Sequence, residues 1–271
     1  MREKIKDSLQ AGYWDSISDA YQRITRISCS DFHYGPQIPG ESRLQILPKF
    51  EPGMTALELG CGGAQNSVWL AKQGVDCTAM DISEAQIANA RKIALANGVS
   101  IRLQQGRLER FKKFVGDETF DFVHSSHAME FVEYPGDVIR DMVSCLKQGG
   151  TLMISTVHPL YNGDWICGDY EDGEACEDYL SNGLFLKSYF EPPDDIRDED
   201  GQHVISRAHP VSSWFKWLRV AGLEVVAIEE PAAVADPPYT SDDWTEHEGQ
   251  LDVIPSTLIF VARLPRLSIC S

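Results

Sequence analysis

The sequence predicts an α/β fold in which a seven-stranded, mostly parallel, doubly wound sheet lies between two layers of helices, as a three-layer sandwich. Two observations predict it. Apolar strand patterns alternate with helix patterns through the middle of the 271-residue chain, which is typical of a parallel sheet covered by helices. A glycine-rich turn at residues 60–63 joins the first strand of that series to the first helix, where open α/β sheets bind ligands.

Each element is bounded by turn residues. Seven apolar runs are expected as strands: residues 54–60, 75–81, 100–105, 120–125, 151–157, 223–229 and 256–264. Helices are expected at residues 65–73, 83–97, 135–146 and 211–221. The second helix begins with the capping box Ser83-Glu84-Ala85-Gln86, and Gly149-Gly150 is expected to close the third.

The ends of the chain and two late segments do not follow this alternation. We expect an N-terminal helical cap at residues 1–50 and a main domain at 51–271, with insertions at about 159–206 and 231–255. Residues 164–200 hold thirteen Asp or Glu against one Lys and one Arg. This acidic stretch is either a lid that selects a cationic amine or a solvated face.

Composition excludes several classes of function. The net charge of −17 opposes binding to nucleic acid, whose phosphates need cations. No stretch reaches the roughly 18 to 20 apolar residues of a membrane span, and the charged start resembles no signal peptide. Seven cysteines without a Cys-x-x-Cys pair indicate reduced thiols. A cytoplasmic location is therefore expected, and the oligomeric state is left open.

Two motifs predict a nucleoside pocket at the first two strand ends. The segment Leu57-Glu58-Leu59-Gly60-Cys61-Gly62-Gly63-Ala64 ends the first strand, and glycines allow the backbone to approach a ligand closely. Asp81 ends the second strand, 19 residues after Gly62, where a carboxylate can accept both hydroxyls of an adenosine ribose. A dinucleotide motif would need a third glycine where Gln65 stands, so the ligand is not expected to be a dinucleotide.

The pattern Glu58-x-Gly60-x-Gly62 resembles the glycine motif of the class I S-adenosylmethionine-dependent methyltransferases, in their small-molecule, natural-product-type branch. Further segments resemble the family's later motifs at the usual intervals: residues 75–83, 119–123, 146–152 and 217–225. Ala64 departs mildly, because many members have a third glycine there. The resemblance covers residues 54–264 and implies a Rossmann-like methyltransferase domain at 51–271, with the last strand antiparallel.

By this resemblance the cofactor is S-adenosyl-L-methionine. Gly60, Cys61 and Gly62 would lie against its methionine part, while Asp81 would hold the ribose. The full set of expected cofactor contacts is Tyr34, Glu58, Gly60, Cys61, Gly62, Asp81, Ile82, Arg107, Leu108 and Ser125. Arg107 stands where many members carry Asp at the adenine edge, so a direct contact to the adenine amino group is not expected from it.

The resemblance implies in-line transfer of the methyl group to an oxygen or nitrogen of a small-molecule acceptor. Candidate bases are His127 and His158, which follow the fourth and fifth strands; the alternative for each is a structural hydrogen bond. His124 is expected to pack in the core. No metal is expected, because Ser125, Ser126 and His127 occupy the rim where metal-dependent relatives carry acidic or amide ligands.

Three alternatives remain open. One is a polyamine-synthase-like transferase that uses a decarboxylated cofactor, and another is a regulatory module without turnover. The third rests on Asp236-Pro237-Pro238-Tyr239, which resembles the signature of amino-methylating DNA enzymes but lies about 110 residues after the fourth strand. In the cap, Trp14, Tyr21 and Phe32 either cover the cofactor or only dock a helix.

Overall fold

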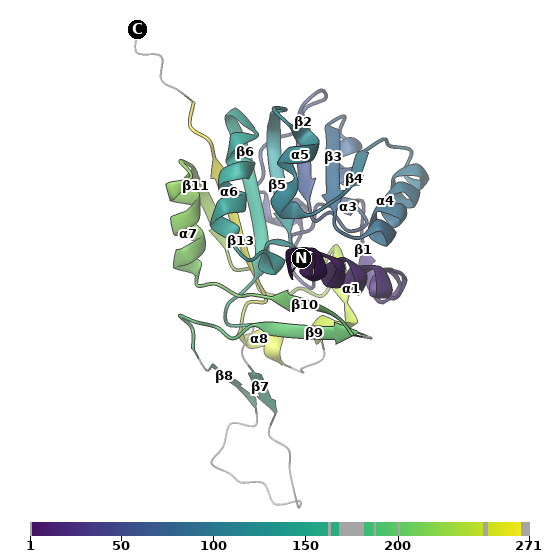
Figure 1. Ribbon diagram of the computed structural model, residues 1–271. Helices are drawn as coiled ribbons and strands as arrows, with labels where there is room; N and C mark the ends of the chain where they lie inside the picture. Colours follow the sequence, from purple (N-terminus) through teal and green to yellow (C-terminus); the bar gives the residue numbers. More distant parts are fainter. Residues whose placement is uncertain are drawn as a thin grey trace, which may run out of the picture.

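The structure is a computed structural model that describes residues 2–161, 164–167, 182–186, 188–199, 201–245 and 249–266. A seven-stranded sheet in the order β11-β13-β6-β5-β2-β3-β4 forms its centre (Figure 1). The strands are β2 (Thr55–Leu59), β3 (Asp76–Asp81), β4 (Arg102–Gln105), β5 (Phe120–Ser126), β6 (Leu146–Val157), β11 (Glu224–Glu229) and β13 (Thr257–Arg263). Pairs among β2 to β6 are parallel, and β13 is antiparallel to both of its neighbours. The predicted sheet is confirmed, including its antiparallel last strand.

Helices cover both faces of the sheet, which gives the predicted three layers. The helices of the alternating series are α3 (Gln65–Ala71), α4 (Glu84–Ala96), α5 (Lys112–Val115), α6 (Pro135–Ser144) and α7 (Val211–Val220). On one face the largest core cluster joins the sheet to α6 and α7 through Ile139 and Trp214. On the other face, Phe32 from the N-terminal segment packs with Leu70 of α3. Burial of these apolar side chains is the main source of the sheet's stability.

One expected boundary was wrong. Gly149-Gly150 do not precede the fifth strand, because β6 already begins at Leu146, which pairs with Phe120. Gly149 lies within the strand at φ +82, a backbone conformation that favours glycine, and its N–H donates to the carbonyl of Leu264. The glycines therefore mark an irregularity inside the strand and not its start.

The N-terminal segment and the late insertions lie together beside the sheet (Figure 1). The long helix α1 (Arg2–Ile24) packs against the hairpin of β9 (Asp195–Glu199) and β10 (Gln202–Ser206). The short strand β1 (Thr25–Ile27) pairs with β12 (Tyr239–Ser241). The remaining elements are α2 (Glu41–Leu44), β7 (Asp164–Cys167), β8 (Asn182–Phe185), α8 (Gln250–Val253) and the 3-10 helices η1 (Leu108–Arg110), η2 (Met129–Phe131) and η3 (Asp242–Thr245).

Much of the acidic stretch 164–200 lies outside the described residues, and the division into cap and domain stays a prediction. Within the described part of the chain, no helix has both the length and the apolar character needed to cross a bilayer. Four cysteines of that part, Cys29, Cys61, Cys77 and Cys145, are free thiols.

Candidate functional site

A cavity of about 120 Å³ lies at the carboxyl ends of β2, β3 and β5, and we call it the first cavity. Seven of the ten predicted cofactor contacts line it: Glu58, Gly60, Cys61, Gly62, Asp81, Ile82 and Leu108. They come from separate stretches of sequence that the parallel sheet brings to one edge. This is the edge at which doubly wound sheets place their ligands.

The glycine loop needs its glycines for two separate reasons. Gly60 has φ +72, and a Cβ there would lie 2.2 Å from the Cβ of Ala128. Gly62 has φ +50, and its N–H donates to the Asp81 carboxylate at 2.8 Å. The backbone therefore turns tightly and leaves the edge of the sheet open to a ligand.

Asp81 is fixed at the end of β3 by backbone donors. Its two carboxylate oxygens accept from the N–H groups of Gly62, at 2.8 Å, and Ser83, at 2.9 Å. Burial raises the pKa of Asp81, and these donors act against that rise. Each carboxylate oxygen has a second lone pair, so the group can still accept hydrogen bonds from a ribose.

The cap helix α1 is attached to the start of α4 beside the first cavity. Ser83 caps α4 as predicted, since its hydroxyl oxygen accepts from the Gln86 N–H at 3.0 Å. The Asp15 carboxylate of α1 accepts from the Ser83 hydroxyl at 2.6 Å and from the Ala85 N–H at 3.1 Å. The Gln86 side chain does not complete the capping box; its amide oxygen accepts from the Gln22 side chain of α1 at 3.0 Å.

Glu58 forms part of the floor of the first cavity. It is buried in β2, and its carboxylate accepts from the backbone N–H of Ser67 at 3.1 Å and from the Ser67 hydroxyl. Burial raises the pKa of Glu58 to about 8, although both bonds from Ser67 favour the charged form. Its carboxyl group thus holds the start of α3 against the sheet.

Three of the ten predicted cofactor contacts are not among the residues that line the first cavity, and two of them, Tyr34 and Ser125, are buried elsewhere. Tyr34 is fully buried in the core, where its hydroxyl donates to the Glu41 carboxylate. Ser125 is buried as well, and its hydroxyl donates to the Leu59 carbonyl at 2.8 Å. Successive residues of a strand point to opposite sides, so the next residue, Ser126, lines the cavity instead.

Arg107 also points away from the first cavity. Its guanidinium forms a two-point contact with the Glu109 carboxylate, with Nε–Oε2 at 3.0 Å and Nη2–Oε1 at 2.5 Å. Arg107 lines a separate small cavity, whereas Glu109 lines the first cavity. Glu109 was missed because its role depends on this pairing, which spacing in the sequence does not reveal.

His33 was missed beside the predicted Tyr34. It lines the first cavity, and its Nδ1 is buried without a hydrogen-bond partner among the described residues. Burial, followed by the nearby His127, lowers the pKa of His33 to about 3. The sequence indicated that residues 31–36 could contact the cofactor. Whether the ring of His33 or that of Tyr34 faces the cavity depends on the backbone conformation of this segment, which the sequence does not reveal.

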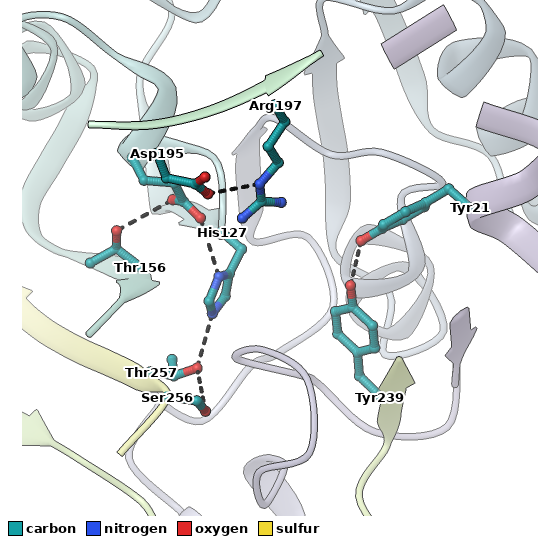
Figure 2. Close-up of polar contacts among 9 residues, drawn as sticks. Tyr21, His127, Thr156, Asp195, Arg197, Tyr239, Ser256 and Thr257 are labelled. Atoms are coloured by element: carbon teal, nitrogen blue, oxygen red, sulfur yellow. Dashed lines mark hydrogen bonds and ion pairs between the residues drawn. The ribbon is translucent and has the colours of Figure 1, made fainter. Parts of the chain in front are cut away.

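A second cavity of about 600 Å³ adjoins the first. The residues that line both are Trp14, Tyr21, His127, Phe131 and Tyr239. The hydroxyls of Tyr21 and Tyr239 are hydrogen-bonded, which connects the cap helix to the second insertion (Figure 2). Tyr239 closes the Asp-Pro-Pro-Tyr segment, whose Asp236 instead pairs with Arg43 at 2.5 Å. Tyr239 therefore reaches the first cavity from a loop about 110 residues after the fourth strand in the sequence, whereas the DNA-enzyme signature directly follows that strand.

His127 lies where the two cavities meet (Figure 2). Its Nδ1 is 3.2 Å from Oε1 of Glu130, and its Nε2 is 3.0 Å from the Thr257 hydroxyl. The second oxygen of Glu130 accepts from the Thr156 hydroxyl at 3.3 Å. A carboxylate accepts only, so the proton of the neutral ring lies on Nδ1 and the lone pair on Nε2.

His158, the other candidate base, lines neither of these cavities. Its Nδ1 accepts from the Leu160 N–H at 3.1 Å, and its Nε2 donates to Glu230 at 2.8 Å. Burial lowers the pKa of His158, and Glu230 acts against that change. The ring therefore connects the loop after β6 to the end of β11, which corresponds to the structural alternative. Among the described residues, no group of His, Cys, Asp and Glu is arranged to hold a metal ion.

Comparisons with known proteins agree with this arrangement. Residues 57–154 match a family described as a methyltransferase domain. The ubiquinone biosynthesis O-methyltransferase of Pasteurella multocida (strain Pm70) is 35% identical over 127 residues, which are 43% of this chain and 52% of that protein. The chain thus spans about half the length of the curated relatives it matches.

Solved structures share the fold at low identity. An S-adenosylmethionine-dependent methyltransferase from Mesorhizobium loti has a TM-score of 0.61 at 22% identity, covering 81% of this chain and 94% of that one. The cyclase SpnF has a TM-score of 0.60 at 17% identity, covering 94% and 95%. The fold alone therefore does not determine the reaction. Residues 57–154, which include the glycine loop and Asp81, are thus similar to the methyltransferase-domain family.

Proposed function

We propose that this chain binds S-adenosyl-L-methionine in the first cavity and transfers its methyl group to an oxygen or nitrogen of a small-molecule acceptor in the second. One observation carries the proposal: the two cavities share a wall that contains His127. A cofactor bound along the glycine loop and Asp81 can then present its methyl group to an acceptor on the other side of that wall.

Alignment supplies most of the catalysis in this proposal. The sulfonium methyl is already electrophilic, so the chain's main task is to hold nucleophile, methyl carbon and sulfur in line. Such positioning can contribute about 7–11 kcal/mol. The cap helix contributes Trp14 and Tyr21 to both cavities, where their rings exclude water from the transfer point.

His127 is the proposed proton acceptor. A hydroxyl acceptor must lose its proton as its oxygen attacks the methyl carbon, and an ammonium acceptor must lose one beforehand to free the nitrogen lone pair. Glu130 orients the ring through Nδ1, and Nε2 carries the lone pair that takes the proton. In the structure the Thr257 hydroxyl faces Nε2, so this hydroxyl must yield its place or pass the proton on.

The comparisons support a small-molecule acceptor, because the relative from Pasteurella multocida is named for ubiquinone biosynthesis. They leave the acceptor atom open. A natural-product-type acceptor and a cytoplasmic location, both expected from the sequence, remain part of the proposal.

Titration calorimetry with S-adenosylmethionine and its demethylated product tests the cofactor site. Asp81→Ala should weaken binding at least about tenfold, because a carboxylate that accepts from the ribose is lost. Asp76→Ala, at the opposite end of the same strand, is the matched control and should bind normally. Unchanged affinity in Asp81→Ala would place the ribose elsewhere.

Two further experiments distinguish the proposed function from the polyamine-synthase-like transferase and from the regulatory module. Preference for the decarboxylated cofactor would favour the polyamine-synthase-like reading. Tight cofactor binding without transfer of a labelled methyl group to any component of a metabolite extract would favour a regulatory module.

A further inference from the structure

Aromatic rings form much of the wall of the second cavity. On one side Trp14 of α1 contacts Tyr13, Tyr21 and Phe131 edge to face, with ring centroids 5.3 to 6.1 Å apart. Elsewhere in the lining, the rings of Tyr161 and Trp244 stack at 4.7 Å, and Trp244 also meets the edge of His127. Electron-rich ring faces attract cations, most strongly when the site excludes water.

The charged groups of the same walls are mainly acidic. Among the described lining residues, the carboxylates of Glu130, Asp194 and Asp195 face a single guanidinium, that of Arg197. Asp194 and Asp195 belong to the acidic insertion, so at least this part of it borders the cavity. Asp194 also lies 3.8 Å from Arg207, outside the cavity lining.

Arg197 shows what this environment does to a cation. Its Nε donates to Asp195 at 2.9 Å, and its side chain, which is 43% exposed, lines the second cavity, where Figure 2 draws it between His127 and Tyr21. Desolvation lowers the pKa of Arg197, but Asp195, Tyr13 and Glu130 raise it above its ordinary value. A second positive group in the cavity would meet the same carboxylates and the same ring faces.

We infer that the acceptor is a cationic amine, held between the aromatic walls and the carboxylates of Glu130 and Asp195, and that its nitrogen receives the methyl group. This inference rests on the proposed function. The ammonium group gives one proton to His127, its freed lone pair forms the N–CH₃ bond, and the S–CH₃ bond breaks to leave a neutral thioether.

The O-methyltransferase name of the relatives does not oppose a nitrogen acceptor. The methyltransferase-domain match covers residues 57–154, and only His127, Glu130 and Phe131 of the cavity lining lie within it. Apart from these three residues, the aromatic and acidic walls come from the cap helix and from segments after residue 154, which that match does not include.

Binding of three small probes to the full chain, saturated with the demethylated cofactor, tests the inference. The probes are 2-phenylethylamine, 2-phenylethanol and phenylacetate, which share a ring and differ in charge. We expect the amine to bind about tenfold more tightly than the other two, with an affinity that falls as salt rises. Equal binding of all three, binding of none, or a preference for phenylacetate would overturn the inference. The cofactor titration itself reports separately on the proposed function.

Two variants that remove opposite charges from the cavity give a second test, because they should change amine binding in different directions. Asp195→Asn should weaken binding of the amine several-fold, while Arg197→Ala should strengthen it or leave it unchanged, because it releases Asp195 from its partner. If the acceptor were an anion, Asp195→Asn would strengthen its binding and Arg197→Ala would weaken it. Glu199→Gln, exposed on the same strand and outside the cavity, is the matched control and should behave as the unaltered protein.

Discussion

His124 is a polar residue in an apolar position. Its ring is fully buried in β5, stacked on Phe122 with centroids 4.8 Å apart, as the sequence pattern predicted. Neither of its ring nitrogens has a hydrogen-bond partner among the described residues. Burial lowers the pKa of His124 to about 3, with a smaller effect from His33, so the ring is neutral at pH 7.

His124→Leu should therefore stabilise the protein. The substitution keeps the side-chain volume similar and removes two buried polar atoms that have no partners. Burying each such atom costs about 1–3 kcal/mol of folding free energy, and the lost stacking on the neighbouring ring offsets part of the gain. We expect the free energy of unfolding in urea to rise by about 1–2 kcal/mol at pH 7. A fall of that size would mean that the ring nitrogens are satisfied in the folded protein.

His127 and His158 provide a paired test of catalysis. His127→Ala should lower kcat by about 10²–10⁴, because a base at the transfer point is lost, with little change in cofactor affinity. His158→Ala should lower thermal stability and leave kcat unchanged, since within the described part of the chain its ring bonds to Leu160 and Glu230 and lines neither cavity. Steady-state kinetics on a turned-over acceptor, with calorimetry of both variants, measures the two effects. Loss of kcat in His158→Ala alone would reverse the assignment.

Sequence reasoning identified residues that line the first cavity where backbone position alone decides this. Gly60, Gly62 and Asp81 were predictable because a strand end and a glycine turn determine where they lie. It failed where the direction of a side chain decides: Ser125 and Ser126 are adjacent, yet only Ser126 reaches the first cavity. A one-residue uncertainty in a strand exchanges its two faces, so such choices require the structure.

Between elements, the contact of α1 with α4 couples the cap to the cofactor site. Asp15 satisfies the Ser83 hydroxyl and the Ala85 N–H at the start of α4, where a carboxylate is also favoured by the helix dipole. Trp14, its neighbour in α1, lines both cavities. A loosened α1 would therefore open the site.

Asp15→Ala should detach this end of the cap. Loss of two charge-assisted hydrogen bonds costs about 1–3 kcal/mol at an exposed site. We expect faster hydrogen exchange in α1 and several-fold weaker binding of S-adenosylmethionine. Asp19→Ala, exposed one turn later on the same helix, is the control and should leave both unchanged. Identical exchange in the two variants would show that Asp15 does not hold the helix.

The elements of the sheet were predictable because each has its own local period and turn signals. The second cavity was not, since its walls come from residues 13–21, 127–131, 193–197 and 239–244, which only the tertiary fold brings together. Trp14 and Tyr21 were recognised as cap aromatics, but their common wall with Tyr239 depends on the pairing of β1 with β12.

Across the whole molecule, buried ionisable groups of opposite type control how stability depends on pH. His33 and His124 have a pKa of about 3 when folded, against 6.5 for an ordinary histidine. Acidification from pH 6.5 toward 3 therefore protonates them first in the unfolded chain and removes stability. Glu58 has a folded pKa of about 8 against 4.5, so its contribution is lost as pH rises from 4.5 to 8.

The cofactor-free protein should consequently be most stable near pH 6.5. Each group changes the free energy of unfolding by up to about 1.4 kcal/mol per pH unit within its window. Of these three groups, the two histidines outweigh Glu58 below pH 6.5, so stability falls on acidification. Between pH 6.5 and 8 only Glu58 among the three still favours the unfolded chain more strongly as pH rises, so stability falls. Urea unfolding from pH 4.5 to 8.5 measures the curve. Glu58→Gln should flatten its alkaline side and His124→Leu should make its acidic side shallower, whereas a maximum at pH 8 in the unaltered protein would mean that Glu58 is ionised when folded.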